Sequence, residues 1–147
     1  MNIKSLNHMG LVVADLDKTR SFYIDFLGFE EIPRPANFLF GGAWLRAKCG
    51  DEVHVILAAD TTSDAGIPDP GRAKSEGLAT HFAFEVDDLE GFIKRAKEMG
   101  LEIVGGPMNR GLGATQVYIQ DPDGYQVELF GRTDRKTSDR IRLAVHD

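Results

Sequence analysis

The sequence predicts an α+β fold built from two paired βαβββ modules. A strand pattern that contains a histidine occurs twice, at residues 6–14 and 78–86. A helical pattern follows each copy and stops at a glycine, which is Gly28 in the first copy and Gly100 in the second. Each copy then closes on a similar apolar strand. A duplicated module explains this repeated order better than a chance match between generic strand and helix patterns.

The first module can be followed along the chain. Its opening strand spans 6–14, and Asp15 can cap a helix over 16–27. This helix carries aromatic residues on its buried side, and Gly28 ends it. Short apolar runs predict three further strands. The aromatic residues are Phe22, Tyr23 and Phe26, and the runs are 29–33, 38–47 and 52–59.

The second module repeats this order. Strand 78–86 leads to Asp87 or Asp88, and either can cap a helix with apolar residues at helical spacing. A glycine-dense stretch, Gly105–Gly113, is predicted as a loop, and the segment Asp121–Gly124 has the composition of a tight turn. The apolar helix residues are Leu89, Phe92, Ile93 and Ala96, and the remaining strands are predicted at 102–104, 114–119 and 125–130.

The chain is predicted to form one domain over 1–135. A polar stretch rich in Gly, Pro, Asp and Ser separates the modules and is the natural linker. The predicted boundaries are 1–60 for module one, 61–77 for the linker, 78–131 for module two and 132–147 for a charged tail.

Composition narrows the function. A formal net charge of −6 over 147 residues argues against a non-specific partner such as nucleic acid or an anionic membrane. The single cysteine, Cys49, excludes an internal disulfide and a cysteine-based zinc cluster. The glycine-rich stretch lacks the GK[ST] ending of a P-loop, so no nucleotide cofactor is expected. Neither a signal peptide nor a long apolar span is present, and a cytoplasmic location is the expectation.

Strand parity directs four polar residues to one side of the predicted sheets. Alternate residues of a strand face opposite sides. In the opening strand of each module, the apolar residues would face the helix, while His8 or His81 faces away from it. In the closing strand of each module, His54 or Glu128 takes the corresponding place. All four side chains are therefore expected on the face away from the helices.

Three imidazoles and one carboxylate suit one divalent ion, with zinc, nickel, cobalt, manganese and iron(II) as candidates. A strand histidine taken alone is usually just a hydrogen-bonded side chain. A carboxylate such as Glu128 in an apolar strand is harder to dismiss, because burial without a partner is costly. Equivalent places in a duplicated chain favour a shared metal site. His54 is its weakest member, because the other three would already form a three-ligand site.

Further residues are candidates for binding substrate. Trp44 and Arg46 are two apart in a strand and share a face, but the sequence does not say which face. Arg46 either clamps a carboxylate or phosphate or is a surface arginine. Arg110 either contacts an anionic group from a loop folded over the substrate or lies in a plain connection. The candidate pocket walls are Gln126, Phe38 and Phe40.

The chain resembles the vicinal oxygen chelate superfamily, which includes glyoxalase I, methylmalonyl-CoA epimerase, fosfomycin-resistance proteins, bleomycin-resistance proteins and extradiol dioxygenases. The resemblance implies a curved, barrel-like mixed sheet with the helices outside, metal ligands at His8, His54, His81 and Glu128, and a homodimer. Whether one chain completes a site or chains share it stays open. The segments that carry the resemblance are Asn7–Val13, Gly28–Phe29, Val53–Ile56, Thr80–Phe84 and Asp121–Leu129.

Departures from the family pattern matter for the chemistry. Glyoxalase I usually has a glutamate where His54 stands, and methylmalonyl-CoA epimerase has a glutamine. A second carboxylate ligand is therefore missing, and Glu128 is the only carboxylate ligand able to act as general base. The subset His8, His81 and Glu128 is similar to the iron triad of extradiol dioxygenases and the manganese triad of fosfomycin-resistance proteins.

The expected function is that of a metal-dependent, glyoxalase-like enzyme. Two vicinal oxygens on the ion would stabilise an enolate, so a lyase or isomerase acting on a small, oxygen-rich substrate is the leading hypothesis, with Glu128 shuttling the proton. One alternative is an iron(II) extradiol-type dioxygenase. Another is a non-catalytic protein that binds a small toxic compound and so confers resistance.

Overall fold

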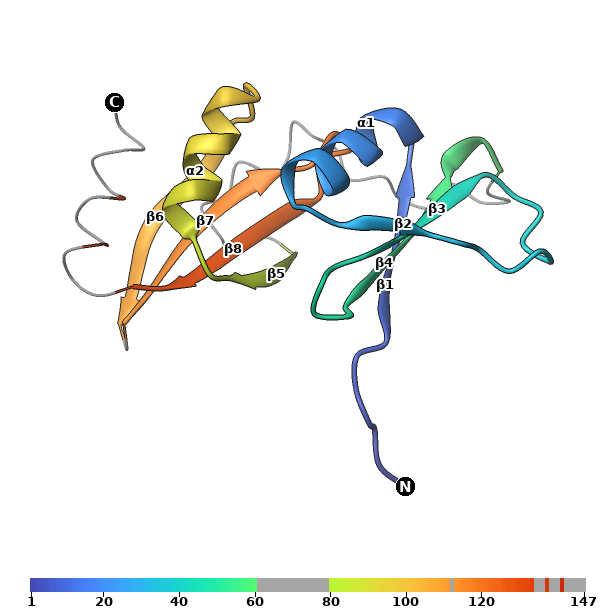
Figure 1. Cartoon of the computed structure of the whole chain (residues 1–147), viewed down its shortest axis with the longest axis horizontal. Coiled ribbons are helices and arrows are strands. Elements are labelled where there is room, and N and C mark those ends of the chain that lie inside the picture. The colour runs from blue at the N-terminus through green and yellow to red at the C-terminus, as the bar shows by residue number, and fades with distance from the viewer. Residues whose placement is uncertain (61–79, 112, 134–136, 138–140, 142–147) are drawn as a thin grey trace. The chain divides into compact units, whose positions relative to one another are not determined.

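The computed structural model describes residues 1–60, 80–111, 113–133, 137 and 141. The chain divides into two compact units, Met1–Ile67 and Pro68–Asp147. Each unit contains one four-stranded mixed sheet with a helical segment (Figure 1). The predicted linker at 61–77 lies outside the described residues, as does most of the predicted tail. None of the helices in the described part of the chain has both the length and the apolar character needed to span a membrane.

The first unit has the predicted βαβββ order. Its sheet runs β1-β4-β3-β2, with β1 parallel to β4 and the other pairs antiparallel. A short 3-10 turn, η2 (Ala58–Asp60), follows the last strand. The other elements are β1 (His8–Val13), α1 (Leu16–Arg20), the π-helical segment η1 (Ser21–Phe26), β2 (Glu30–Ile32), β3 (Gly42–Arg46) and β4 (Glu52–Leu57).

The predicted helix at 16–27 changes type halfway. Asp15 caps it as expected, because its Oδ1 accepts hydrogen bonds from the backbone N–H groups of Asp17 (3.0 Å) and Lys18 (3.2 Å). From Ser21 onward the helix is of the π type, so the predicted helix is confirmed and consists of an α-helical and a π-helical segment. The wider turn lets the consecutive aromatic residues Phe22 and Tyr23 both enter the core.

The strand predicted at 38–47 is shorter than expected and begins only at Gly42. The segment before it is engaged by a side chain. The Arg34 guanidinium donates hydrogen bonds to the carbonyl oxygens of Phe40 (2.7 Å) and Gly42 (3.0 Å). Arg34 also lies 4.9 Å from the centre of the Phe40 ring. Arg34 thus contacts the backbone on both sides of Gly41, whose own carbonyl oxygen accepts a hydrogen bond from the Leu57 N–H at 2.9 Å.

The second unit repeats the topology of the first. Its sheet runs β5-β8-β7-β6, with β5 parallel to β8. The duplication predicted from the sequence is therefore confirmed, as is the α+β fold of two βαβββ modules, and both sheets are open and curved. The elements are β5 (His81–Val86), α2 (Leu89–Glu98), β6 (Ile103–Gly111), β7 (Ala114–Gln120) and β8 (Gln126–Arg132).

The glycine-dense stretch 105–113 is largely a strand, which corrects the predicted loop. β6 runs through it to Gly111 and pairs antiparallel with β7. The pairing is interrupted by register shifts, and Gly106 and Gly111 have φ angles of 83° and 80° there. Glycine tolerates this left-handed conformation, so the glycines permit bulges within a strand rather than a free loop. Arg110 therefore lies in β6.

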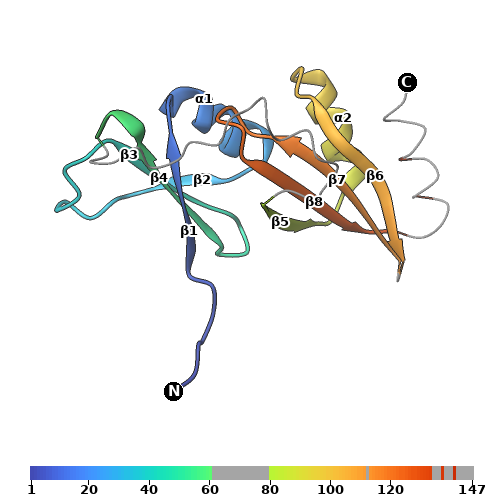
Figure 2. The ribbon, with the colours of Figure 1, turned by 180° about the vertical axis from the view of Figure 1, so that it is seen from behind.

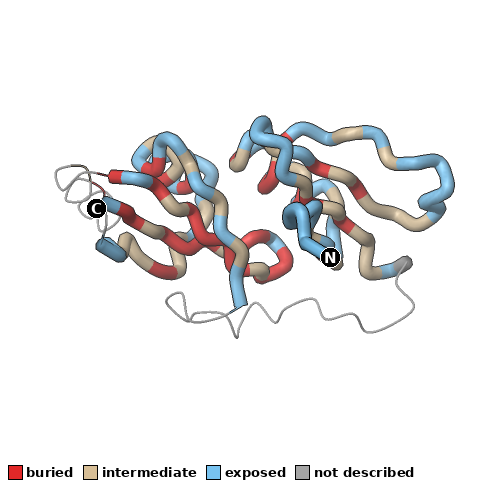
Figure 3. The backbone as a smooth tube through the Cα atoms, turned by 90° about the horizontal axis from the view of Figure 1, so that it is seen from below, coloured by how far each residue is buried: buried red, intermediate tan, exposed pale blue. Residues whose placement is uncertain are grey.

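α2 covers one face of the second sheet, and Figure 2 shows that sheet from its other face. Asp88 caps the helix by accepting a hydrogen bond from the Gly91 N–H at 2.8 Å. Leu89 and Ile93 are buried, and a Cβ placed on Gly131 of β8 would lie 2.8 Å from the Leu89 Cβ. The helix thus lies close against the sheet, and buried residues gather along the strands of each unit (Figure 3).

Candidate metal centre

The two sheets place the predicted ligands in equivalent register. In the first unit, His8 opens β1 and His54 of β4 pairs with Gly10, two residues further on. In the second unit, His81 opens β5 and Glu128 of β8 pairs with Ala83, again two residues further on. His54 and Glu128 therefore occupy the same ladder position in their modules, as the sequence alignment of the two copies predicted.

In the first unit His54 lies between two aromatic rings. The His8 ring stacks on it with centroids 4.0 Å apart and planes inclined by 14°. The Trp44 ring, from the paired position of β3, stacks on it at 4.0 Å with planes inclined by 3°. This contact answers the question that the sequence left open, because Trp44 lies on the same face as His54.

The nitrogen lone pairs of the stacked His8 and His54 rings do not point toward a common position. The lone pair of an imidazole nitrogen lies in the ring plane, so nearly parallel rings aim their lone pairs in nearly parallel directions. One ion bound by both residues requires His8 to turn out of the stack. His8 is exposed, and its Nδ1 is 2.8 Å from the side-chain oxygen of Asn7, which leaves Nε2 as the nitrogen available to an ion.

Glu52 is the charged neighbour of His54. One of its oxygens, Oε2, lies 2.7 Å from His54 Nε2, and the other accepts hydrogen bonds from Arg46 at 2.7 and 2.9 Å. The hydrogen bonds with His54 and Arg46 hold the pKa of the Glu52 carboxyl below its ordinary value. The guanidinium of Arg46, predicted as a substrate clamp, is thus engaged by a carboxylate of its own sheet.

In the second unit Glu128 is the centre of a polar cluster. The residue is only 4% exposed, and its Oε2 lies 3.1 Å from His81 Nε2. The Tyr118 hydroxyl donates a hydrogen bond to the same oxygen at 3.0 Å. Burial raises the pKa of the Tyr118 phenol, so this group stays a neutral donor at physiological pH. Two predicted ligands, His81 and Glu128, therefore meet.

The second oxygen of Glu128 is held by an amide. Gln116 donates a hydrogen bond from Nε2 to Glu128 Oε1, and its own Oε1 accepts from Arg110 Nε at 2.6 Å. Arginine only donates and a carboxylate only accepts, so these two partners fix which way the Gln116 amide points. Arg110, predicted to contact substrate, is therefore linked to Glu128 through Gln116.

Gln126 presents a buried amide. It is 2% exposed, and within the described part of the chain neither its Oε1 nor its Nε2 has a hydrogen-bond partner. It follows the same strand parity as Glu128, two residues along β8. A buried amide that lacks a partner carries a desolvation penalty of about 1–3 kcal/mol, which a bound polar group would relieve.

The structure brings the predicted ligands together as two pairs, His8 with His54 and His81 with Glu128. Among the residues that the structure describes, no group of three or more His, Cys, Asp or Glu side chains comes close enough to hold an ion. Each unit contributes one pair, so a single site made of all four residues remains a prediction. The donor chemistry of imidazoles with a buried carboxylate fits a borderline divalent ion.

Sequence reasoning missed four residues that contact the predicted ligands. They are Asn7, Glu52, Gln116 and Tyr118. Strand parity held the signal, because Gln116 and Tyr118 alternate with buried apolar residues in β7, and Glu52 shares the parity of His54 in β4. Several polar residues can lie on the same face of a strand. The register between strands decides which of them contacts a predicted ligand, and the sequence of a single strand does not specify that register.

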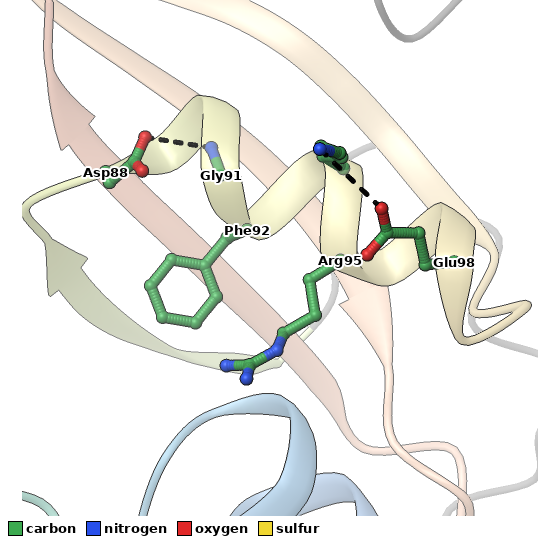
Figure 4. Close-up of a pocket in the computed structure, with 6 residues that line it drawn as sticks. Asp88, Gly91, Phe92, Arg95 and Glu98 are labelled. Atoms are coloured by element: carbon green, nitrogen blue, oxygen red, sulfur yellow. Dashed lines mark hydrogen bonds and ion pairs between the residues drawn. The ribbon is translucent and has the colours of Figure 1, made fainter.

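A surface hollow of about 330 Å³ lies along α2, away from these residues. Phe92 and Arg95 project from one side of the helix there (Figure 4). The lining consists of α2 residues and the Asp88 cap, and it includes none of the predicted ligands. The hollow therefore does not enter the metal site.

Comparison with known proteins decides the family. The model of the Glyoxalase/Bleomycin resistance protein/Dioxygenase superfamily matches residues 5–129. The chain belongs to this superfamily. This confirms the vicinal oxygen chelate resemblance drawn from the sequence.

Individual members of the superfamily are similar over most of this chain. Glutathione transferase FosA of Serratia marcescens is 34% identical over 129 residues, which cover 86% of this chain and 80% of that protein. Glyoxylase I 4 of Arabidopsis thaliana is 28% identical over 130 residues, covering 88% and 71%. The crystal structure of a glyoxalase/dioxygenase from Nostoc punctiforme is 25% identical and superposes with a TM-score of 0.74, covering 90% of this chain and 94% of that one.

Proposed function

We propose that this chain is a metal-dependent enzyme that acts on a small, oxygen-rich substrate by lyase or isomerase chemistry. The ion would be held by His8, His54, His81 and Glu128. The contact between the buried Glu128 carboxylate and His81, 3.1 Å apart, carries the proposal. These two residues occupy the ladder positions that His54 and His8 occupy in the first module. Zinc, nickel, cobalt, manganese and iron(II) are the candidate ions.

Glu128 is the residue that would move a proton. The bound ion would supply a Lewis acid that polarises substrate oxygens. Glu128 would accept a proton from the substrate carbon at a carboxylate oxygen and return it to a neighbouring atom. The Tyr118 hydroxyl and the Gln116 amide each donate to one of its oxygens, so the carboxylate is oriented before substrate arrives.

The predicted substrate contacts differ in how well the structure supports them. Gln126 has strong support, because its buried amide has no hydrogen-bond partner among the described residues. Trp44 offers a flat apolar surface beside His54. Arg46 and Arg110 hold Glu52 and Gln116, so each would reach substrate only while also keeping its own partner in place. We retain all four residues as proposed substrate contacts.

A second candidate function is thiol transfer to a small electrophile. The observation in its favour is the 34% identity with a glutathione transferase, which exceeds the 28% identity with the glyoxylase I relative. The subset His8, His81 and Glu128 would suffice as ligands for this alternative. The two reactions differ in their effect on free thiol. Thiol transfer joins the thiol to the electrophile and consumes it, whereas the isomerase reaction rearranges an existing thiol adduct and consumes no free thiol.

One experiment tests the metal and the reaction together. Protein purified without a metal-affinity tag is analysed for metal and assayed on the methylglyoxal–glutathione adduct, and on fosfomycin with glutathione. Glu128→Gln is expected to lower turnover about 10²–10⁴-fold. Glu85→Gln, which removes an exposed carboxylate paired with Arg132 in the same sheet, serves as the control. A protein without stoichiometric metal, or equal rates for the two variants, would sink the proposal.

A further inference from the structure

We propose that Glu52 is the positioning residue of His54. Its carboxylate accepts the Nε2–H of that imidazole, fixes the tautomer, and leaves Nδ1 as the nitrogen that binds the ion. This inference rests on the proposed metal role of His54.

The orientation of the His54 ring is held by two contacts that do not depend on His8. Trp44 stacks on one face of the ring at a centroid distance of 4.0 Å, so the ring plane is set by this stacking. Rotation within that plane is set by the edge contact between Nε2 and Glu52 Oε2, at 2.7 Å. A carboxylate has no proton to donate, so the imidazole is the donor in this contact. The nitrogen that remains with an open lone pair is Nδ1.

Glu52 is itself held in place. Arg46 donates from Nε and Nη2 to Glu52 Oε1, at 2.9 and 2.7 Å, and leaves Oε2 to His54. The three residues lie on adjacent antiparallel strands, where Arg46 is paired directly with Glu52 and Trp44 directly with His54. The side chains of Glu52 and His54 are 17% and 15% exposed, so solvent competes little for their contact. Arg46, Glu52 and His54 thus form one ordered relay.

The relay places a carboxylate one hydrogen bond behind the imidazole of His54. Carboxylate partners of metal-binding histidines fix the tautomer and raise the basicity of the ligand, and their loss commonly costs about 10–100-fold in metal affinity.

The same unit offers a matched control. Arg20 and Glu31 form a second arginine–glutamate pair, with distances of 2.9 and 3.1 Å between donor and acceptor atoms. Glu31 lies in β2, outside the strands that carry the predicted ligands. Replacing Glu31 therefore removes an equivalent ion pair without touching His54.

The first measurement needs no metal. Long-range ¹H–¹⁵N spectra of the histidines of the metal-free protein, at about pH 8 where free imidazoles are neutral, report which ring nitrogen carries the proton. We expect His54 to be the Nε2–H tautomer in the wild type and in Glu31→Ala, and a mixture of tautomers in Glu52→Ala. Glu52→Gln keeps an oxygen acceptor and is expected to retain the tautomer. An Nδ1–H tautomer in the wild type would overturn the proposal.

The second measurement is affinity for Co²⁺, followed by its visible absorption and by the fluorescence of Trp44, the single tryptophan of the chain. We expect Glu52→Ala to weaken Co²⁺ binding about 10–100-fold, Glu52→Gln to weaken it less, and Glu31→Ala to leave it unchanged. The Trp44 emission of the metal-free variants, compared with wild type, reports that they fold.

The His54→Ala variant separates failure of the inference from failure of the proposed function. If His54→Ala lowers Co²⁺ affinity while Glu52→Ala does not, His54 is a ligand and Glu52 does not position it. If His54→Ala leaves Co²⁺ affinity unchanged, His54 is not a ligand, and the proposal falls with the metal role on which it rests.

Discussion

At the scale of single residues, the carboxylate of Glu128 is defined by its donors. Tyr118 and Gln116 each donate to a different oxygen, and His81 lies beside the oxygen that Tyr118 contacts. Such a buried group is tolerated because both oxygens have partners. Removing one donor should therefore cost stability, and the cost should depend on the negative charge of Glu128.

Tyr118→Phe is expected to lower the free energy of unfolding by about 1.5–3 kcal/mol, the usual loss for a hydrogen bond to a charged group. Denaturant unfolding of the metal-free protein measures it. In the Glu128→Gln background the same substitution should cost clearly less, because the acceptor is no longer charged. Equal costs in the two backgrounds would show that the hydroxyl and the carboxylate are not coupled.

At the scale of elements, an ion pair connects the first helix with the strand that follows it. Arg20 of α1 donates to both oxygens of Glu31 in β2. The hydrogen bond from Arg20 is the main cause that lowers the pKa of the Glu31 carboxyl in the folded protein. Because the folded pKa of Glu31 lies below the unfolded pKa, the pair contributes its full stabilisation above the unfolded pKa. This contribution is lost as the pH falls through the folded pKa.

Glu31→Gln should therefore lower the free energy of unfolding at neutral pH by about 0.2–1 kcal/mol, since both partners are partly exposed. Its difference from wild type should shrink as the pH drops below the ordinary carboxyl value of 4.5 and vanish in stronger acid. Urea titrations across the acid range measure this. A difference that grows toward low pH would contradict the assigned sign.

The glycines of β6 decide whether this stretch can pair as a strand. Gly106 and Gly111 both have positive φ angles, but they differ in the space around them. A Cβ on Gly106 would lie 2.5 Å from the carbonyl oxygen of Gln116 in the neighbouring strand, whereas a Cβ on Gly111 would have nothing within 4 Å. A substitution at Gly111 thus tests backbone strain alone, whereas a substitution at Gly106 adds a steric conflict with the neighbouring strand.

Gly111→Ala should cost about 1 kcal/mol, from the strained backbone conformation alone. Gly106→Ala should cost at least about 1 kcal/mol more, because β6 must also move away from β7. Thermal or denaturant unfolding of the two variants measures the difference. If they were equally stable, the close approach of the strands at Gly106 would be in doubt.

At the scale of the whole molecule, the proposed site depends on both modules. His8 and His54 come from one unit, and His81 and Glu128 come from the other. Two protein ligands are fewer than the three or four that zinc sites usually use. Neither pair is therefore expected to hold an ion tightly alone, and a homodimer, proposed from the family resemblance, would offer the pairs of two chains to each other.

We expect one ion per chain, counted by mass spectrometry after dialysis. The double substitution His8→Ala with His54→Ala should abolish tight binding, and so should His81→Ala with Glu128→Gln. Light scattering should give twice the chain mass of 16.2 kDa for the wild type. Two ions per chain, or tight binding that survives the loss of either pair, would show that the modules act separately.

Much of this arrangement was readable from the sequence. The duplicated histidine strand, the Asp15 and Asp88 caps and the glycines after each helix predicted two βαβββ modules, because these signals depend on local backbone preferences. The strand patterns also placed His54 and Glu128 in the closing strands of their modules, β4 and β8. The glycine-dense stretch misled the prediction, because glycine is equally compatible with a loop and with a bulged strand until a neighbouring strand is present.

The chain by itself determined the repeat, its order of elements and the residues able to bind a metal, since periodicity and side-chain chemistry are written in the sequence. Only the tertiary structure decided that Glu52 lies against His54, that Tyr118 and Gln116 hold Glu128, and that Arg46 and Arg110 engage partners of their own. The physical reason is that register across strands, which no single strand specifies, selects the neighbour of each side chain.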